Sequence, residues 1–310
     1  MTERIRALKE KAVEIAGAAQ VLTDEPMSAH TTFRIGGPAD LFLIPESETQ
    51  VQELLRACRR EEVAAHILGN GSNLLVSDTG VRGAVILIDH NLQEICCEKN
   101  EIRAQAGALL VAAAGCAKRA ALTGLEFAGG IPGTVGGAVT MNAGAYGGEI
   151  RDVLTCVRAL DGDLSLKEIP AEKLNLGYRT SAVQTEGLVV LSAVFSLAKG
   201  DAEAIAGRME ELRAARAAKQ PLQVPSAGST FKRPEGQYAG KLIMDAGLAG
   251  ASEGDAQVSE KHCGFVINRG SATAADVLRL IRRVQKEVLS ASGVELEPEV
   301  RFWGDFSYVS

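Results

Sequence analysis

The stretch EFAGGIPGTVGGAVTMNAGAYGGE, residues 126–149, decides how this sequence is interpreted. Eight of its residues are glycine, and none is Lys, Arg or His. Glycine lets backbone N–H groups converge on an anion and lets a flat ring or a pyrophosphate approach without meeting a Cβ atom. A single glycine usually serves a turn or close packing, but repeated Gly-Gly pairs raise the entropy lost on folding. Together with a second such segment, GNGSN at residues 69–73, the stretch predicts a site for a phosphate-bearing cofactor.

The common nucleotide-binding motifs fit neither segment. GNGSNL, residues 69–74, begins like GxGxxG after a strand, and Asp89 falls at about the right distance for a ribose contact, but position 74 is Leu. The residues between Gly71 and Gly83 are too few and too β-like to form the helix that a Rossmann site needs. Gly-Lys-Ser/Thr does not follow the glycine-rich stretch, so the sequence also argues against a P-loop.

Composition limits the classes of protein that fit. The chain has 310 residues, 46% of them hydrophobic and 23% charged, which indicates a globular protein of two or three domains. A net charge of -6 argues against nucleic acid or anionic membrane as a partner held by general electrostatics, and leaves room for a local basic pocket that suits a small anion. The N-terminus lacks the apolar core of a secretory signal, and no run approaches membrane-spanning length.

The six cysteines contain no CxxC and lie mostly in apolar segments, so we predict buried free thiols, neither disulfides nor metal ligands. These observations together predict a cytoplasmic protein with no metal, nucleic-acid or membrane partner.

Hydrophobic periodicity predicts alternating helices and strands. Ser47 is expected to cap a helix that runs to about Glu62, and a hairpin is expected to turn at Lys99 and Asn100. The other predicted helices are residues 1–17, 108–122, 201–220, a short one near Lys241, and 273–292. The predicted strands are residues 64–69, 74–78, 83–88, 153–170, 187–198, 263–268 and 293–304. We place a domain boundary at the predicted helix 201–220, where strands and loops are followed by a strongly helical segment.

Five ordered motifs resemble the UDP-N-acetylenolpyruvoylglucosamine reductase family. They are ILGNGSNLLVSD (67–78), GLEFAGGIPGTVGGAVTMNAGAYGGEI (124–150), LGYRTS (176–181), PSAGSTFKRP (225–234) and LEPEVRFWG (296–304). The similarity runs from about Thr31 to Gly304. The short link after GYRTS resembles the branch of the family that lacks an inserted tyrosine loop over the substrate.

The resemblance implies an α+β protein. It implies a two-part FAD-binding module of the vanillyl-alcohol-oxidase (PCMH) type at residues 1–200, with subdomains at about 1–88 and 89–200. A substrate domain at 201–310 follows, whose last strand is free to pack back on the FAD module. The implied reaction is NADPH-dependent reduction of UDP-N-acetylglucosamine enolpyruvate to UDP-N-acetylmuramate through FAD, in peptidoglycan biosynthesis. A monomer is expected.

The resemblance also implies site residues. In the family the glycine-rich segments lie along FAD. The implied cofactor residues are Gly69, Asn70, Gly71, Ser72, Asn73, Ile131, Gly133, Gly136, Gly137, Asn142 and Gly144.

Three residues match the positions that act on the substrate. Hydride addition to the enolpyruvyl methylene carbon builds negative charge that spreads into the neighbouring carboxylate, so the site needs a cation or acid there and a proton donor over the adjacent carbon. Arg179 is the implied cation, Glu299 the acid and Ser229 the proton donor. Without the family, Arg179 would be interpreted as a surface or structural arginine and Glu299 as a solvated strand residue.

Substrate contacts are implied for Tyr178, Lys232, Arg233, His262 and Asn268. Two adjacent cations are ordinarily a solvated surface, and a histidine beside a strand is as often structural. At Ala249 many relatives carry lysine, so one contact is missing or moved.

Two alternatives remain at this level. One is an FAD oxidase or dehydrogenase with the same fold, which would not need to protonate carbon. The other is a non-catalytic module that binds flavin or a sugar nucleotide. The resemblance also implies that NADPH and the sugar nucleotide use one cleft in turn, so a separate nicotinamide domain is unnecessary. This predicts ping-pong kinetics and inhibition by excess substrate.

Overall fold

The computed structural model describes residues 2–309, which form two compact units. The first unit comprises Met1–Leu22, Leu41–Asn70 and Gly83–Arg216, and the second comprises Thr23–Asp40, Gly71–Arg82 and Ala217–Ser310. Each unit therefore contains segments that are far apart in the sequence. The assignment of cofactor and substrate roles to residues 1–200 and 201–310 stays a prediction.

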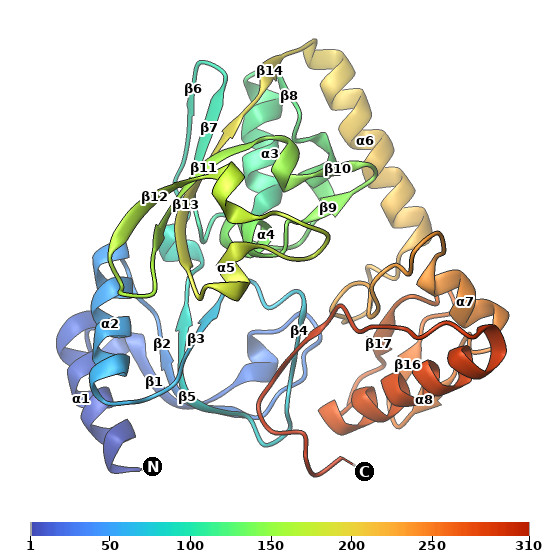
Figure 1. The fold of residues 1–310 in the computed structure, drawn as a ribbon, viewed down its shortest axis with the longest axis horizontal. Coiled ribbons are helices and arrows are strands. Elements are labelled where there is room, and N and C mark those ends of the chain that lie inside the picture. Colours follow the sequence, from blue (N-terminus) through green and yellow to red (C-terminus); the bar gives the residue numbers. More distant parts are fainter. Residues whose placement is uncertain (1, 310) are drawn as a thin grey trace. The chain divides into compact units, whose positions relative to one another are not determined.

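A five-stranded antiparallel sheet organises the first unit (Figure 1). Its order is β12 (Leu166–Pro170), β11 (Leu154–Leu160), β13 (Val189–Ser196), β7 (Glu101–Gln105) and β6 (Ile95–Glu98). The central strand β13 is buried along seven of its eight residues, as its apolar composition predicts. The helices α3 (Leu110–Arg119) and α4 (Val135–Thr140) pack on this sheet. The hairpin turn at Lys99 is confirmed, with φ 53°.

A second sheet has the strand order β1 (Val21–Pro26), β2 (Pro38–Leu43), β5 (Val81–Leu87) and β3 (Ala65–Leu68). Strands β3 and β5 are parallel, with Ala65 opposite Ala84. Helices α1 (Glu3–Ala16) and α2 (Glu48–Arg60) contribute to the same apolar core. Ser47 caps α2 by accepting a hydrogen bond from the Gln50 N–H, as predicted.

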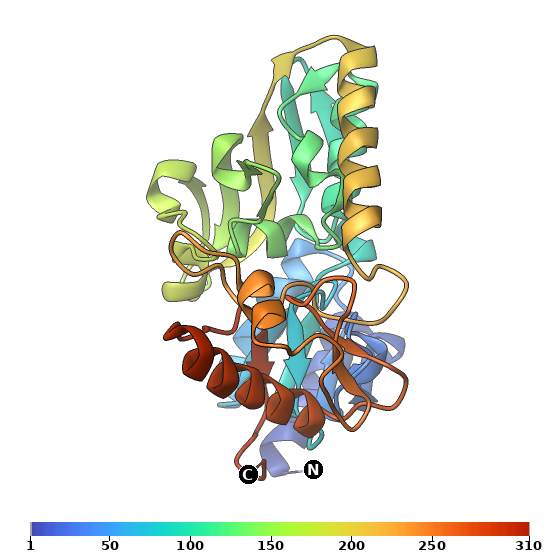
Figure 2. The same cartoon turned by 90° about the vertical axis from the view of Figure 1, so that its right-hand side faces the viewer.

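The remaining elements of the first unit are short, apart from α6 (Ala202–Lys219), whose last residues enter the second unit. Figure 2 shows α6 running along the side of the first unit. The short elements are β8 (Leu122–Thr123), β9 (Gly144–Ala145), β10 (Gly148–Glu149), β14 (Ala198–Lys199), α5 (Ala182–Thr185) and the 3₁₀ turns η1 (Ala18–Gln20), η3 (His90–Leu92), η4 (Glu126–Gly130), η5 (Ile150–Asp152) and η6 (Ala171–Leu174).

The second unit packs a long helix on a small sheet. Helix α8 (Ala274–Ser292) covers the antiparallel strands β15 (Ser252–Glu253), β16 (Ala256–Val258) and β17 (Val266–Asn268). Its N-terminus carries a capping box between Thr273 and Asp276, which fits the predicted start. The other elements are η2 (Met27–Ala29), α7 (Ala239–Asp245) and the parallel pair β4 (Leu74–Val76) and β18 (Arg301–Trp303).

Two segments differ from the sequence-based expectation. Residues 126–149 contain α4 and η4, which the high glycine content concealed. The predicted final strand 293–304 is regular only at Arg301–Trp303. Before it, the backbone pairs with a loop: Lys232 N–H donates to Glu297 C=O and Glu299 N–H to Thr230 C=O, both at 2.8 Å.

All six cysteines are free thiols. Cys58 and Cys263 are buried, but the prediction of burial is wrong for Cys96 and Cys97, which are exposed. Both lie on β6, an edge strand of the five-stranded sheet, so they have a neighbouring strand on one side only.

None of the helices between residues 2 and 309 has the length and apolar character needed to cross a lipid bilayer.

The thiols should differ in reactivity towards an alkylating reagent. Burial raises the pKa of Cys58 to about 12, and the thiolate is the reactive form, so Cys58 should stay unmodified in the folded chain. Cys96 and Cys97 are open to the reagent. Peptide mass spectrometry after brief iodoacetamide treatment should find label at Cys96 and Cys97, and at Cys58 only after unfolding. Equal labelling of Cys58 and Cys96 in the native protein would contradict this packing.

Candidate functional site

Two residues of the first glycine-rich segment, Gly69 and Asn70, meet the second segment in the first unit. The side-chain amide of Asn70 donates a hydrogen bond to the Pro132 carbonyl. A Cβ atom at Gly69 would lie 2.4 Å from the Thr134 hydroxyl oxygen, closer than real Cβ contacts. The first segment therefore reaches the second only because position 69 has no side chain.

Several glycines of residues 126–149 are explained by packing within the protein. A Cβ at Gly136 would lie 3.0 Å from the Ala106 Cβ, and one at Gly148 would lie 2.7 Å from the Phe127 ring. At Gly144 the nearest atom would be the Glu149 Cβ, at 2.8 Å. Close packing therefore accounts for more of the glycine content than the sequence suggested.

Some backbone N–H groups of the segments are already used. Val135 and Gly136 donate to Ala108 and Ala106 carbonyls at 2.8 and 2.9 Å, and Gly137 donates to the Thr134 hydroxyl at 3.3 Å. Across residues 2–309, by contrast, no group accepts a hydrogen bond from the backbone N–H of the four residues Asn70, Gly71, Ser72 and Gly133. Asn70 and Gly133 lie in the first unit, and Gly71 and Ser72 lie in the second. Unpaired N–H groups of this kind can donate to an anion.

Gly71 has a left-handed backbone with φ 56°, and a Cβ there would lie 2.1 Å from the His30 carbonyl oxygen. Ile131 is half-buried. The position of the segment 69–73 thus depends on bare backbone at two of its residues, Gly69 and Gly71.

Asn142 links the glycine-rich stretch to the loop that carries Arg179. Its side chain is fully buried, donates to Glu149 and to the Gly177 carbonyl at 3.0 Å each, and accepts from the Arg151 N–H at 2.9 Å. The side-chain amide is therefore occupied by the protein itself, and its predicted contact with a cofactor remains a prediction.

Arg179 is held against the same stretch. The backbone of Arg179 has a left-handed φ of 56°, and the Arg179 guanidinium donates a hydrogen bond to the Gly144 carbonyl at 3.3 Å. The guanidinium carbon lies 5.1 Å from the centre of the Tyr178 ring, which is half-exposed. A half-buried cation is thus placed beside one glycine-rich segment.

Ser229 and Glu299 lie on adjacent backbones of the second unit. Gly228, with φ 75°, turns the chain into Ser229, and the next residue, Thr230, accepts the Glu299 N–H at 2.8 Å. The Asn73 side chain donates to the Glu299 carbonyl at 3.2 Å. The loop that carries Ser229 is thereby joined to the segment that carries Glu299, which lies about 70 residues later in the sequence.

The predicted substrate residues of the second unit have different surroundings. Lys232 forms an ion pair with Glu297, and the Arg233 guanidinium lies 4.6 Å from the centre of the Tyr238 ring. Asn268 is buried: it donates to the Phe33 carbonyl at 3.1 Å and accepts from two backbone N–H groups. Asn268 is thus fitted to a structural role, and its substrate contact remains a prediction.

His262 is half-buried beside α7. Its Nδ1 accepts the Gly264 N–H at 3.2 Å, and its ring meets the Phe265 ring edge-on with centroids 4.9 Å apart. Burial lowers the pKa of His262, and the nearby Lys219 ammonium lowers it further. The surroundings of the ring therefore disfavour its charged form.

The sequence analysis missed Arg216, on the inner side of α6. Its Nε is buried and finds no hydrogen-bond partner in the described part of the chain. The sequence contains only a weak signal for a special role of Arg216, because the pattern ELRAARAAKQ is typical of an ordinary charged helix surface.

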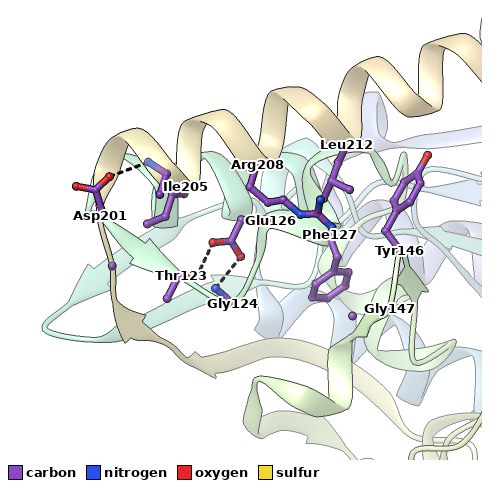
Figure 3. Close-up of a pocket in the computed structure, with 13 residues that line it drawn as sticks. Thr123, Gly124, Glu126, Phe127, Tyr146, Gly147, Asp201, Ile205, Arg208 and Leu212 are labelled. Atoms are coloured by element: carbon purple, nitrogen blue, oxygen red, sulfur yellow. Dashed lines mark hydrogen bonds between the residues drawn. The ribbon is translucent and has the colours of Figure 1, made fainter.

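A cavity of about 520 Å³ lies under α6 in the first unit (Figure 3). The helix contributes Ile205, Arg208 and Leu212 to its wall. Glu126 on the opposite wall accepts hydrogen bonds from Thr123 and from the Gly124 N–H. The predicted site residues do not line this cavity.

Within residues 2–309, no group of three or more His, Cys, Asp or Glu side chains is arranged to hold a metal ion.

Residues 39–168 match the FAD binding domain family, and residues 220–303 match the C-terminal domain of UDP-N-acetylenolpyruvoylglucosamine reductase. These matches, with the mixed helices and strands of the structure, confirm the predicted α+β class with an FAD-binding module followed by a second domain.

Named relatives cover nearly the whole chain. A UDP-N-acetylenolpyruvoylglucosamine reductase of Agathobacter rectalis is 55% identical over 92% of this chain and 95% of its own length. One from Clostridium beijerinckii is 51% identical over 92% and 94%. The crystal structure of the UDP-N-acetylenolpyruvylglucosamine reductase from Thermus caldophilus is 38% identical, covers 92% of this chain and 98% of its own, and superposes with a TM-score of 0.76.

His262 should make stability depend on pH. Because its pKa in the folded protein is below that in the unfolded chain, the unfolded chain binds more protons between the two values, and the free energy of unfolding rises with pH there. This contribution is complete above about 6.5 and is lost as the pH falls through the lower, folded-state value. Urea unfolding of His262→Gln between pH 5 and 7 should show a flatter pH dependence than the parent. Identical pH profiles for the parent and His262→Gln would contradict the assignment.

Proposed function

The chain belongs to the UDP-N-acetylenolpyruvoylglucosamine reductase family, and from that premise we propose that Arg179, Ser229 and Glu299 are the groups through which it acts on its substrate. The reaction is the NADPH-dependent reduction of UDP-N-acetylglucosamine enolpyruvate to UDP-N-acetylmuramate in peptidoglycan biosynthesis. The enzyme is an FAD-dependent oxidoreductase. When bound, FAD would supply the hydride-transfer chemistry between NADPH and the terminal methylene carbon of the enolpyruvyl group.

The residues present fit FAD. In the first unit, the unpaired N–H groups of Asn70 and Gly133 are suited to its diphosphate, and Gly69 lets the two glycine-rich segments approach each other. Gly71 and Ser72, in the second unit, have unpaired N–H groups of the same kind. We propose that these residues, with Asn73, Ile131 and the other glycines predicted above, line the cofactor.

Arg179 is proposed to hold the carboxylate of the enolpyruvyl group. An arginine remains charged at any pH at which the protein works and meets a carboxylate through two N–H groups. Its contacts with the Gly144 carbonyl and the Tyr178 ring fix the side chain before substrate arrives. A preorganised cation stabilises the charge that builds on the carboxylate without a cost of reorganisation.

Ser229 is proposed to give a proton to the carbon next to the carboxylate, with Glu299 acting on the developing enolate. The observation that carries this pairing is the hydrogen bond from Glu299 N–H to Thr230 C=O, 2.8 Å, which sets the glutamate beside the serine loop. Because a serine hydroxyl is a poor acid in water, a half-buried position such as that of Ser229 favours the role.

Lys232, Arg233, His262, Tyr178 and Asn268 are proposed to contact the UDP-sugar. Arg233, stacked on Tyr238, presents a cation suited to the diphosphate of the substrate. Lys232 would have to exchange its ion pair with Glu297 for the same role, which exposed pairs do at little cost.

We further propose that the enzyme is a cytoplasmic monomer with neither membrane nor nucleic-acid partners, and that the cofactor and substrate domains divide near residue 200. Light scattering of the purified chain should give a mass near 32.6 kDa. A mass of twice that value would exclude the monomer.

The half-reactions test the role of Ser229. In Ser229→Ala, anaerobic reduction of the flavin by NADPH should proceed at the parent rate, because no proton is given to carbon in that step. Reoxidation by the enolpyruvyl sugar should slow by about 10²- to 10⁴-fold, the usual contribution of a general acid. Stopped-flow absorbance of the flavin measures both steps. Ser226→Ala, in the same loop, is the matched control and should leave both rates unchanged.

Equal slowing of both half-reactions in Ser229→Ala would remove the serine from the donor role. A parent protein whose flavin is bleached by NADPH but is not reoxidised by the enolpyruvyl sugar would be a flavin-binding module without this activity.

A further inference from the structure

Arg216 is a cation without a counterion. Its Nε is buried and has no hydrogen-bond partner in residues 2–309. No acidic side chain in the same residues pairs with its guanidinium. Burial lowers its pKa, opposed only by the nearby Tyr146 hydroxyl. Leaving a charged hydrogen-bond donor unpaired in the interior is costly, so such groups in native proteins normally have a partner. Arg216 as a whole is half-buried, and its buried Nε lacks a hydrogen-bond acceptor.

The position of the side chain indicates which anion is missing. A Cβ at Gly130 would lie 2.9 Å from the Arg216 Cδ and 3.4 Å from its Nη1, so the guanidinium stem lies directly on the backbone of the glycine-rich stretch. About two turns earlier on α6, Met209 lies on Gly129 in the same way. Two residues after Gly130, the Pro132 carbonyl accepts the Asn70 side chain. Arg216 is thus next to the place where the two segments meet.

The segments themselves offer no positive charge. Residues 126–149 contain no Lys, Arg or His, and neither do residues 69–73. A diphosphate held there by N–H groups alone would keep its two negative charges uncompensated in a partly buried site. A cation from another element is needed, and α6 brings one to Gly130.

We propose that Arg216 pairs with the diphosphate of FAD, donating guanidinium N–H groups to its oxygens. This rests on the proposed function only in taking FAD as the cofactor. Arginine suits the role because its planar donors match phosphate oxygens in pairs. The candidate groups for the substrate diphosphate, Lys232 and Arg233, belong to the second unit, whereas the contacts of Arg216 lie in the first.

The release of FAD from the purified holoenzyme tests the pairing. In Arg216→Met, which keeps the length of the stem but not the charge, the dissociation constant for FAD should rise by roughly 10- to 100-fold, the range expected for a hydrogen bond to a charged group. Flavin fluorescence after dilution measures it. Arg216→Lys should fall between Met and the parent. Arg213→Met is the matched control, because Arg213 is on the same helix but is exposed and paired with Glu210.

Thermal unfolding separates this role from simple packing. Without FAD, Arg216→Met should unfold at the parent temperature or above it, because the substitution removes an unpaired charge. With FAD, it should unfold below the parent. Parent-like affinity for FAD, or an equal loss of unfolding temperature with and without FAD, would overturn the inference. Neither measurement uses NADPH or the enolpyruvyl sugar, so failure of the proposed reaction would be seen separately.

Discussion

The contact between two stretches of bare backbone is the constraint on which the first unit depends. Gly69 packs on Thr134, and the Asn70 side chain reaches the Pro132 carbonyl, so a methyl group at position 69 would separate the segments. Within residues 2–309, the N–H groups of Asn70 and Gly133 in this unit have no protein acceptor, which is a property that an anion site requires. Close packing and the proposed cofactor contact would therefore both result from the same absence of side chains.

Charge is supplied to this region from outside it. The glycine-rich stretch is kept neutral, while the loop residue Arg179 and the helix residue Arg216 approach it from two other elements. There is a physical reason for placing the positive charges on other elements and keeping the glycine-rich stretch neutral. Long charged side chains within the stretch would fill the space that the cofactor needs, whereas a guanidinium on a neighbouring helix reaches the backbone and is fixed by that helix. Rigid elements hold such groups more accurately than loops do.

Much of the fold was predictable because local signals agree with the tertiary structure. Ser47 caps α2, Thr273 caps α8 and Lys99 turns the hairpin, each through interactions within four residues in sequence. Local sequence signals failed to predict features that depend on contacts between residues far apart in the sequence. Glycine concealed α4, whose first N–H groups bond to Ala106 and Ala108, and the exposure of Cys97 follows from the place of its strand at a sheet edge.

The order of the motifs alone determined the family and its chemistry, because motifs such as LGYRTS, PSAGSTFKRP and LEPEVRFWG, which carry the proposed catalytic residues Arg179, Ser229 and Glu299, can be recognised from neighbouring residues in the chain. Only the tertiary structure decided which glycines serve packing, that Asn142 and Asn268 bond to their own chain, and that the Nε of Arg216 is buried without an acceptor in residues 2–309. Burial and partners arise from segments far apart in sequence. A helix surface such as ELRAARAAKQ therefore looks alike in the sequence whether it faces water or a cofactor.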